Sequence, residues 1–162
     1  MDEESNTIIL TLHMEVKKLK TNQVSEFKTL VEIFSIAFEN DEQISDDGHL
    51  GKLLSNPNFM VFVVCNETKI VGGLSIYILD RYYQSKPLAY IYDVAIHPAY
   101  QGQGFGKALI SEVCKYCEAN GFEDAYVEAE SDDDDAVNFY RKTQYSNELN
   151  ATHFTYTFNK TH

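Results

Sequence analysis

The sequence predicts a single α/β domain over residues 1–162, with a mixed sheet and helices on both of its faces. Two observations predict this class. Apolar runs of strand length alternate with segments in which apolar residues recur every three or four positions. In addition, a strand, a glycine-rich turn and a helix follow one another at residues 88–120, which is the content of a crossover between neighbouring strands.

Composition is typical of a soluble globular protein, with 44% hydrophobic and 23% charged residues. Nothing approaches the ~20 apolar residues of a membrane span, and the acidic N-terminus does not resemble a secretory signal. Three cysteines do not suggest a disulfide framework, so we expect a reduced, cytoplasmic protein. We expect no membrane partner, and the net charge of −12 argues against nucleic acid as a partner. It is compatible with a cationic substrate, or with a merely soluble acidic surface.

The first half of the chain is predicted to hold a strand, two helices and a strand hairpin. In order, these are a strand at 7–16, a helix capped by Thr21 or Asn22, a short helix at 49–55, and strands at 59–65 and 70–79 around a turn at 66–69. The apolar face of the first helix is expected to consist of Val24, Phe27, Val31, Phe34 and Phe38. Gly72 and Gly73 weaken their strand and mark a bulge or a close backbone approach.

The second half is predicted to contain three strands and two helices. After a polar loop at 80–87 come a strand at 90–96, a helix from Phe105 that ends at Gly121, a strand at 125–130, a helix at 136–143 and a strand at 152–158. Phe105, Leu109 and Val113, with Tyr116 or Cys117, form the buried stripe of the longer helix. The acids at 131–135 can cap and charge the start of the shorter one.

Between the strand at 90–96 and the long helix lies a glycine-rich turn, Gln101-Gly102-Gln103-Gly104-Phe105-Gly106. Glycines let the backbone approach a ligand, and the free N–H groups of the first helical turn then favour an anion. A Walker loop is excluded because Lys107 is followed by Ala108 and not by a hydroxyl residue. A simple tight connection between strand and helix remains open.

At this point the residues resemble a known family. Gln101, Gly104 and Gly106, preceded by Ile96-His97-Pro98, are similar to the acetyl-CoA signature of the GNAT N-acetyltransferases, and residues 136–142 resemble their second motif. The resemblance covers about residues 7–158. It implies the GNAT fold, in which helices flank a mixed, mostly antiparallel central sheet. It also implies an acyltransferase that uses acetyl-CoA as co-substrate. We expect no metal, because no second cysteine pair or histidine cluster accompanies Cys114 and Cys117.

The resemblance also implies how the cofactor binds. Backbone N–H groups from Gln103 to Lys107 would hold the pyrophosphate of coenzyme A. The strand that carries Val94 and Ile96 would pair with the pantetheine arm, and a backbone N–H there would polarise the thioester carbonyl. The cofactor-binding residues implied are Val94, Ala95, Ile96, Gln101, Gly102, Gln103, Gly104, Phe105, Gly106 and Lys107.

A narrower resemblance concerns the acceptor. Tyr92-Asp93 and the pair Asp133-Asp134 look like the small aminoglycoside 3-N-acetyltransferases of the same superfamily, which implies acetylation of a 3-amine and antibiotic resistance. The sequence departs from many members at residues 143–145, where they have Leu-Gly. The substrate-binding residues implied are Tyr92, Glu128, Glu130, Asp133 and Asp134. By analogy with the family, a homodimer is left open.

The chemistry of acetyl transfer supports this interpretation independently. A polycationic amine arrives protonated, so a base must remove a proton, and a buried Asp93 would have a raised pKa suited to that task. The alternative is an ion-paired or hydrogen-bonded structural Asp93. Tyr140 is the candidate acid that protonates the departing thiolate. The alternative is that Tyr140 only packs in the core and that a water is the acid.

Two acidic clusters could attract a polycation. Residues 123–135 hold eight acids and residues 39–47 hold five, and neither stretch contains Lys or Arg. The alternatives are helix capping for the first and a solvated loop for the second. Three other functions stay open: a polyamine N-acetyltransferase, a protein N-acetyltransferase, and an acyl-CoA-binding protein without catalysis.

Overall fold

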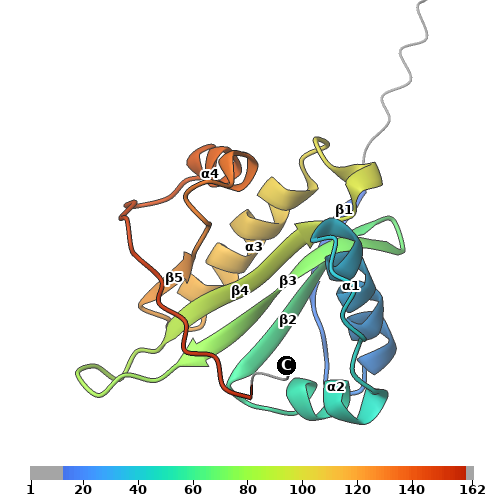
Figure 1. The fold of residues 1–162 in the computed structure, drawn as a ribbon, viewed down its shortest axis with the longest axis horizontal. Helices are drawn as coiled ribbons and strands as arrows, with labels where there is room; N and C mark the ends of the chain where they lie inside the picture. The colour runs from blue at the N-terminus through green and yellow to red at the C-terminus, as the bar shows by residue number, and fades with distance from the viewer. Residues whose placement is uncertain (1–12, 160–162) are drawn as a thin grey trace, which may run out of the picture. The chain divides into compact units, whose positions relative to one another are not determined.

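A computed structural model of the chain describes residues 13–159. These residues fall into two compact units that meet in sequence between Glu128 and Ala129. The described part of the first unit contains five strands, β1 (Met14–Lys18), β2 (Phe59–Asn66), β3 (Lys69–Leu79), β4 (Leu88–Ile96) and β5 (Asp124–Val127). Its helices are α1 (Val24–Ala37), α2 (Asp47–Leu54), the short 3₁₀ helix η1 (Pro98–Tyr100) and α3 (Phe105–Ala119), whereas the second unit contains α4 (Asp134–Arg141) (Figure 1).

The five strands form one sheet in which their spatial order follows their order in the chain. Neighbours from β1 to β4 are antiparallel, and only β4 and β5 are parallel, with α3 as the connection between them. The sheet is therefore mixed and mostly antiparallel, which confirms the predicted fold class.

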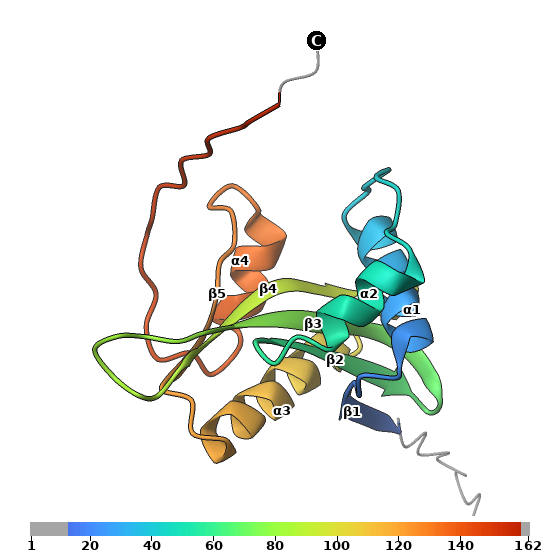
Figure 2. The same cartoon turned by 90° about the horizontal axis from the view of Figure 1, so that it is seen from below.

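Helices cover both faces of the sheet. Figure 2 shows α1 and α2 on one face and α3 on the other. The core under α1 and α2 is built from apolar side chains of these helices and of β2, among them Phe27, Leu30, Leu50, Phe59 and Val61. On the opposite face, Phe62 of β2 packs edge-on against Tyr116 of α3, with ring centroids 5.1 Å apart.

Gly72 and Gly73 lie in β3 where other backbone passes too closely for a side chain, as the sequence predicts. A Cβ on Gly73 would meet the carbonyl oxygen of Phe62 at 2.3 Å. A Cβ on Gly72 would meet the carbonyl oxygen of Ala95 at 2.5 Å. The two glycines therefore allow β3 to sit between β2 and β4 in the centre of the sheet.

Three local predictions need correction. The N-cap of α1 is Gln23, not Thr21 or Asn22, and Gln23 makes no side-chain capping hydrogen bond. The buried face of α1 includes Leu30 and Ile33, whereas Phe38 follows the helix and is 48% exposed. Residues 152–158 form no strand, because alternation supplies only propensity and a strand also needs a hydrogen-bonded neighbour. Residues 7–12 of the predicted first strand lie outside the described residues.

Between residues 13 and 159, no helix combines the length and the apolar character needed to cross a membrane.

Candidate active site

A bulge divides β4 at the predicted catalytic position. Leu74 of β3 is paired with Val94, but Ile76 is paired with Ile91, so Ser75 faces the two residues Tyr92 and Asp93. The backbone N–H of Asp93 donates a hydrogen bond to the Ser75 hydroxyl, with nitrogen and oxygen 3.3 Å apart. In regular strand alternation, Tyr92 and Asp93 would point to opposite faces.

The bulge brings both side chains to the face that α1 and α2 cover. The Tyr92 ring packs edge-on against Tyr77, which belongs to the core on that face. Ala95, two residues after Asp93, is buried in the same core. The charge of Asp93 also acts on the Tyr77 phenol and helps to raise its pKa, after the larger effect of burial. Tyr92 and Asp93 are thereby neighbours on one surface.

Asp93 is partly buried, and desolvation raises the pKa of its carboxyl above the usual 3.8. Within residues 13–159, no lysine, arginine or histidine forms an ion pair with it and no side chain donates a hydrogen bond to it. In this part of the chain, the Asp93 carboxylate is therefore not held by the ion pair or hydrogen bond that a purely structural role would require. An unpaired carboxylate with a raised pKa is suited to accept a proton.

Beyond the bulge, β4 has a free edge. β5 pairs with β4 only from Leu88 to Ile91, and from Tyr92 to Ile96 no described strand lies on that side. The backbone groups of Val94, Ala95 and Ile96 that point away from β3, apart from the Ile96 carbonyl that Gln101 binds, are therefore available to an extended ligand with amide groups. This edge fits the pantetheine arm that the sequence resemblance implies.

The glycine-rich turn follows directly. Gln101 anchors it by donating a hydrogen bond from Nε2 to the carbonyl of Ile96, 3.0 Å away. Gly102 and Gly104 have φ angles of 75° and 90°, which few other residues adopt. A Cβ on Gly102 would have no atom within 4 Å, so the turn is open on that side.

Helix α3 begins at this turn with its first N–H groups free. Its N-cap is Gly104, which has no side chain that could cap the helix. The N–H groups of Phe105, Gly106 and Lys107 therefore have no acceptor within the helix, while that of Ala108 reaches the carbonyl of Gly104. The buried Phe105 ring fixes the start of the helix to the core. Free donors at the positive end of a 15-residue helix fit a pyrophosphate.

Glu128, at the end of the first unit, is held by a residue that the sequence did not indicate. The Tyr90 hydroxyl donates to its Oε2 over 3.2 Å. Tyr90 also lies beside Tyr77 and Tyr126 on neighbouring strands. The signal that could have found them is cross-strand register, which one sequence does not reveal.

The remaining predicted site residues belong to the second unit. Asp133 caps α4, its Oδ1 accepting a hydrogen bond from the N–H of Ala136 at 3.0 Å. Asp134 lies in the first turn of that helix, and Glu130 is exposed. The helix-capping role considered for this cluster is thus confirmed for Asp133. Burial, together with the nearby Asp133 carboxylate, raises the pKa of Tyr140 to about 12, so its phenol stays protonated at neutral pH.

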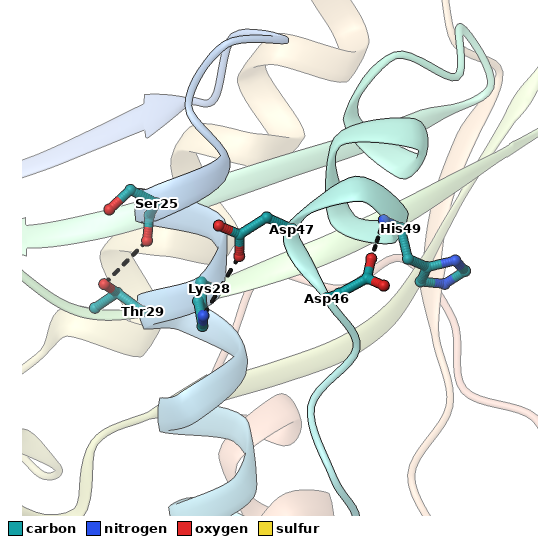
Figure 3. A network of polar contacts seen from close by, with 6 residues as sticks. All are labelled: Ser25, Lys28, Thr29, Asp46, Asp47 and His49. Carbon is teal, nitrogen blue, oxygen red and sulfur yellow. Dashed lines mark hydrogen bonds and ion pairs between the residues drawn. The ribbon is translucent and has the colours of Figure 1, made fainter.

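The other acidic cluster, at residues 39–47, has two members with local structural roles. Asp46 caps α2 by accepting from the N–H of His49 at 2.8 Å, and Asp47 forms an ion pair with Lys28 at 3.3 Å (Figure 3). The ion pair connects α1 with the start of α2. The two contacts account for part of the cluster without a ligand.

Comparison with known proteins agrees with this geometry. The acetyltransferase (GNAT) family model matches residues 27–145. An aminoglycoside acetyltransferase from an uncultured soil metagenomic sample, solved in complex with trehalose, is 43% identical. The similarity covers 90% of this chain and 97% of that one, with a TM-score of 0.88. The same enzyme has also been solved in complex with sisomicin.

Two more distant relatives are informative. A second aminoglycoside acetyltransferase from an uncultured soil metagenomic sample is 26% identical over 89% of this chain and 99% of its own, with a TM-score of 0.79. The glucosamine 6-phosphate N-acetyltransferase of Trypanosoma brucei brucei is 34% identical over 62 residues. Those residues are 36% of this chain and 42% of that enzyme, so the chain spans less than half the length of this relative.

Proposed function

The chain belongs to the acetyltransferase (GNAT) family, and from this premise we propose that it transfers the acetyl group of acetyl-CoA to the 3-amine of an aminoglycoside, which would confer resistance to the antibiotic. The observation that carries the proposal is Asp93, a carboxylate on the β4 bulge that has a raised pKa and no ion-pair partner among residues 13–159. It stands next to the free β4 edge and on the same segment as the glycine turn. A base, a thioester site and a phosphate site are the parts that this reaction needs.

Acetyl-CoA, when bound, supplies an activated acetyl thioester. The N–H groups from Gln103 to Lys107 would hold its pyrophosphate at the positive end of α3. The free edge of β4 at Val94 and Ile96 would pair with the pantetheine amides and point a backbone N–H at the thioester carbonyl oxygen. Such a donor stabilises negative charge that develops on that oxygen.

Asp93 acts as the general base. The acceptor amine is protonated at neutral pH, and one N–H proton passes to the Asp93 carboxylate. The freed lone pair then attacks the acetyl carbonyl carbon directly, so no acyl group is attached to the protein. As the C–S bond breaks, the nitrogen loses its second proton to water and becomes the neutral amide nitrogen. Tyr140, whose pKa of about 12 keeps its phenol protonated, is proposed to give a proton to the departing sulfur.

Recognition of the acceptor is proposed to depend on charge. In the first unit, Tyr92 and Glu128 would contact a polycation through an aromatic ring and a carboxylate. In the second unit, the carboxylates of Glu130, Asp133 and Asp134 would attract it. The net charge of −12 favours the approach of such a molecule. The 43% identical relative that has been solved with sisomicin supports an aminoglycoside as the class of acceptor.

The test is a thiol-release assay with acetyl-CoA and gentamicin, followed by NMR of the product to locate the acetyl group. We expect turnover and a single product acetylated at the 3-amine. Turnover with spermidine or a peptide but not with any aminoglycoside would overturn the acceptor. Acetyl-CoA binding without turnover on any amine would overturn the enzymatic function.

A further inference from the structure

Four tyrosines, which we call the tyrosine row, lie side by side on one face of the sheet. Tyr77 of β3 is directly opposite Tyr90 of β4, and Tyr90 is directly opposite Tyr126 of β5. The rings of Tyr90 and Tyr126 are stacked, 4.8 Å apart and 13° from parallel. Tyr92 meets Tyr77 and Tyr90 edge-on, at 5.5 Å and 6.0 Å.

The row is only partly covered. Tyr92 is 57% exposed and Tyr126 is 36% exposed, although both are large rings on a sheet face. Desolvation raises the pKa values of Tyr77, Tyr90 and Tyr126, so these phenols remain neutral. Neutral phenols both donate and accept hydrogen bonds. The row therefore offers flat aromatic faces bordered by hydroxyl groups.

A carboxylate stands beside each part of the row. Asp93 follows Tyr92 directly at the bulge, and the Tyr90 hydroxyl holds the Glu128 carboxylate at 3.2 Å. Within residues 13–159, neither carboxylate has a lysine or arginine as ion-pair partner. Two free negative charges next to aromatic faces suit a molecule with several rings and several ammonium groups.

Building on the proposed function, we propose that the tyrosine row binds the rings of the acceptor and so selects acceptors by their number of rings. Tyr92 contacts the ring whose amine reacts beside Asp93. Tyr126, stacked on Tyr90, contacts a second ring, and an ammonium group on that ring binds Glu128. The hydrophobic faces of sugar rings pack on aromatic side chains, and ammonium groups are attracted to the same faces and to carboxylates.

This role differs in its consequences from simple packing between strands. If the row only stabilises the sheet, its loss affects all acceptors alike. If Tyr126 binds a second ring, its loss affects only acceptors that have one. Substrates of different ring number therefore separate the two roles.

The experiment compares gentamicin, which has three rings, with 2-deoxystreptamine, its central ring alone. In Tyr126→Leu we expect the ratio of kcat/KM for gentamicin to kcat/KM for 2-deoxystreptamine to fall about fivefold, through KM, since stacking and cation–π contacts are worth about 1 kcal/mol. Tyr126→Phe keeps the ring and should keep the ratio. Tyr90→Phe should lower the ratio by less, about threefold, because Glu128 itself remains and loses only the hydrogen bond that holds it.

Tyr82→Leu is the matched control, because Tyr82 is 91% exposed in the loop between β3 and β4 and belongs to no proposed site. It should leave the ratio unchanged. Wild-type protein without turnover on any aminoglycoside would overturn the proposed function and this inference with it. Wild-type turnover with an unchanged ratio in Tyr126→Leu would overturn this inference alone, even if the melting temperature of the variant falls.

Discussion

The two halves of β4 differ in their neighbours, although the sequence reads as one continuous apolar strand. From Leu88 to Ile91, β4 is paired on both sides, and Ala89 and Ile91 are buried. From Tyr92 to Ile96, β3 is its only partner among the described strands, and Asp93 lies at the division. The first half stabilises the sheet, and the second half carries the backbone edge and the carboxylate that we propose for ligand binding and catalysis. One strand thus combines the proposed base with an edge that no described strand covers.

The largest effect is expected in the second half, from Asp93→Asn. If Asp93 is the base, kcat falls about 10²- to 10⁴-fold while acetyl-CoA still binds, because the amide cannot accept the proton. Steady-state kinetics and calorimetric titration of acetyl-CoA measure the two quantities. Asp80→Asn in the exposed loop after β3 is the control and should be fully active. Full activity of Asp93→Asn would remove this residue from the mechanism.

The opposite result is expected in the first half, from Ile91→Ala. This substitution removes buried volume and should lower the free energy of unfolding by about 2–5 kcal/mol. The activity per folded molecule should be largely retained at a temperature where the variant is folded. Urea denaturation and kinetics test this pair of outcomes. A large loss of kcat with normal stability would mean that the two halves are not functionally distinct.

Ser75→Ala tests the boundary between the halves. The Ser75 hydroxyl accepts the hydrogen bond from the Asp93 N–H, and its loss leaves that donor unpaired at a cost of about 1–3 kcal/mol. We expect a lower kcat and a shift in the pH dependence of kcat/KM as the bulge relaxes. Ser75→Thr keeps the hydroxyl and should restore the wild-type pH profile. A variant that loses stability but keeps the wild-type profile would limit Ser75 to a structural role.

The smallest effect concerns pH and stability. The folded-state pKa of Asp93 is raised, so the folded protein holds this proton more tightly than the unfolded chain does. At neutral pH the ionised carboxylate therefore costs stability, and Asp93→Asn should melt slightly higher than wild type. The gain should shrink as the pH falls through the raised pKa and disappear below 3.8, where both states are protonated. Melting curves at several pH values test this; a gain that is independent of pH would contradict it.

The sequence is sufficient to predict the elements whose signal is local. Three such features are the glycine turn, the start of α3 at Phe105 and the close backbone approach at Gly72 and Gly73. Each depends on residue types that are typical of few local structures. The same holds for Gly121 after α3, whose φ of 79° is the cap conformation expected of it. These features could be predicted because their cause lies within a few residues.

Features that depend on register could not be predicted. The register between β3, β4 and β5 determines the bulge opposite Ser75 and the alignment of Tyr77, Tyr90 and Tyr126. The prediction of a strand at residues 152–158 was wrong for a related reason, because alternation does not supply a neighbouring strand. Pairing is a property of two segments, and a single segment carries little information about it.

The glycine turn and Asp93 lie on one uninterrupted segment, and this continuity has a consequence for how specificity can change. The distance from Asp93 to the glycine turn is set by the strand and the turn that join them, not by the packing of distant elements. Under the proposed function, insertions and deletions around β5 would therefore change the surface that carries Tyr126 and Glu128 while that distance stays the same. Such a protein would acquire a new acceptor in small steps, because each intermediate would retain the proposed base and the proposed acetyl-CoA site.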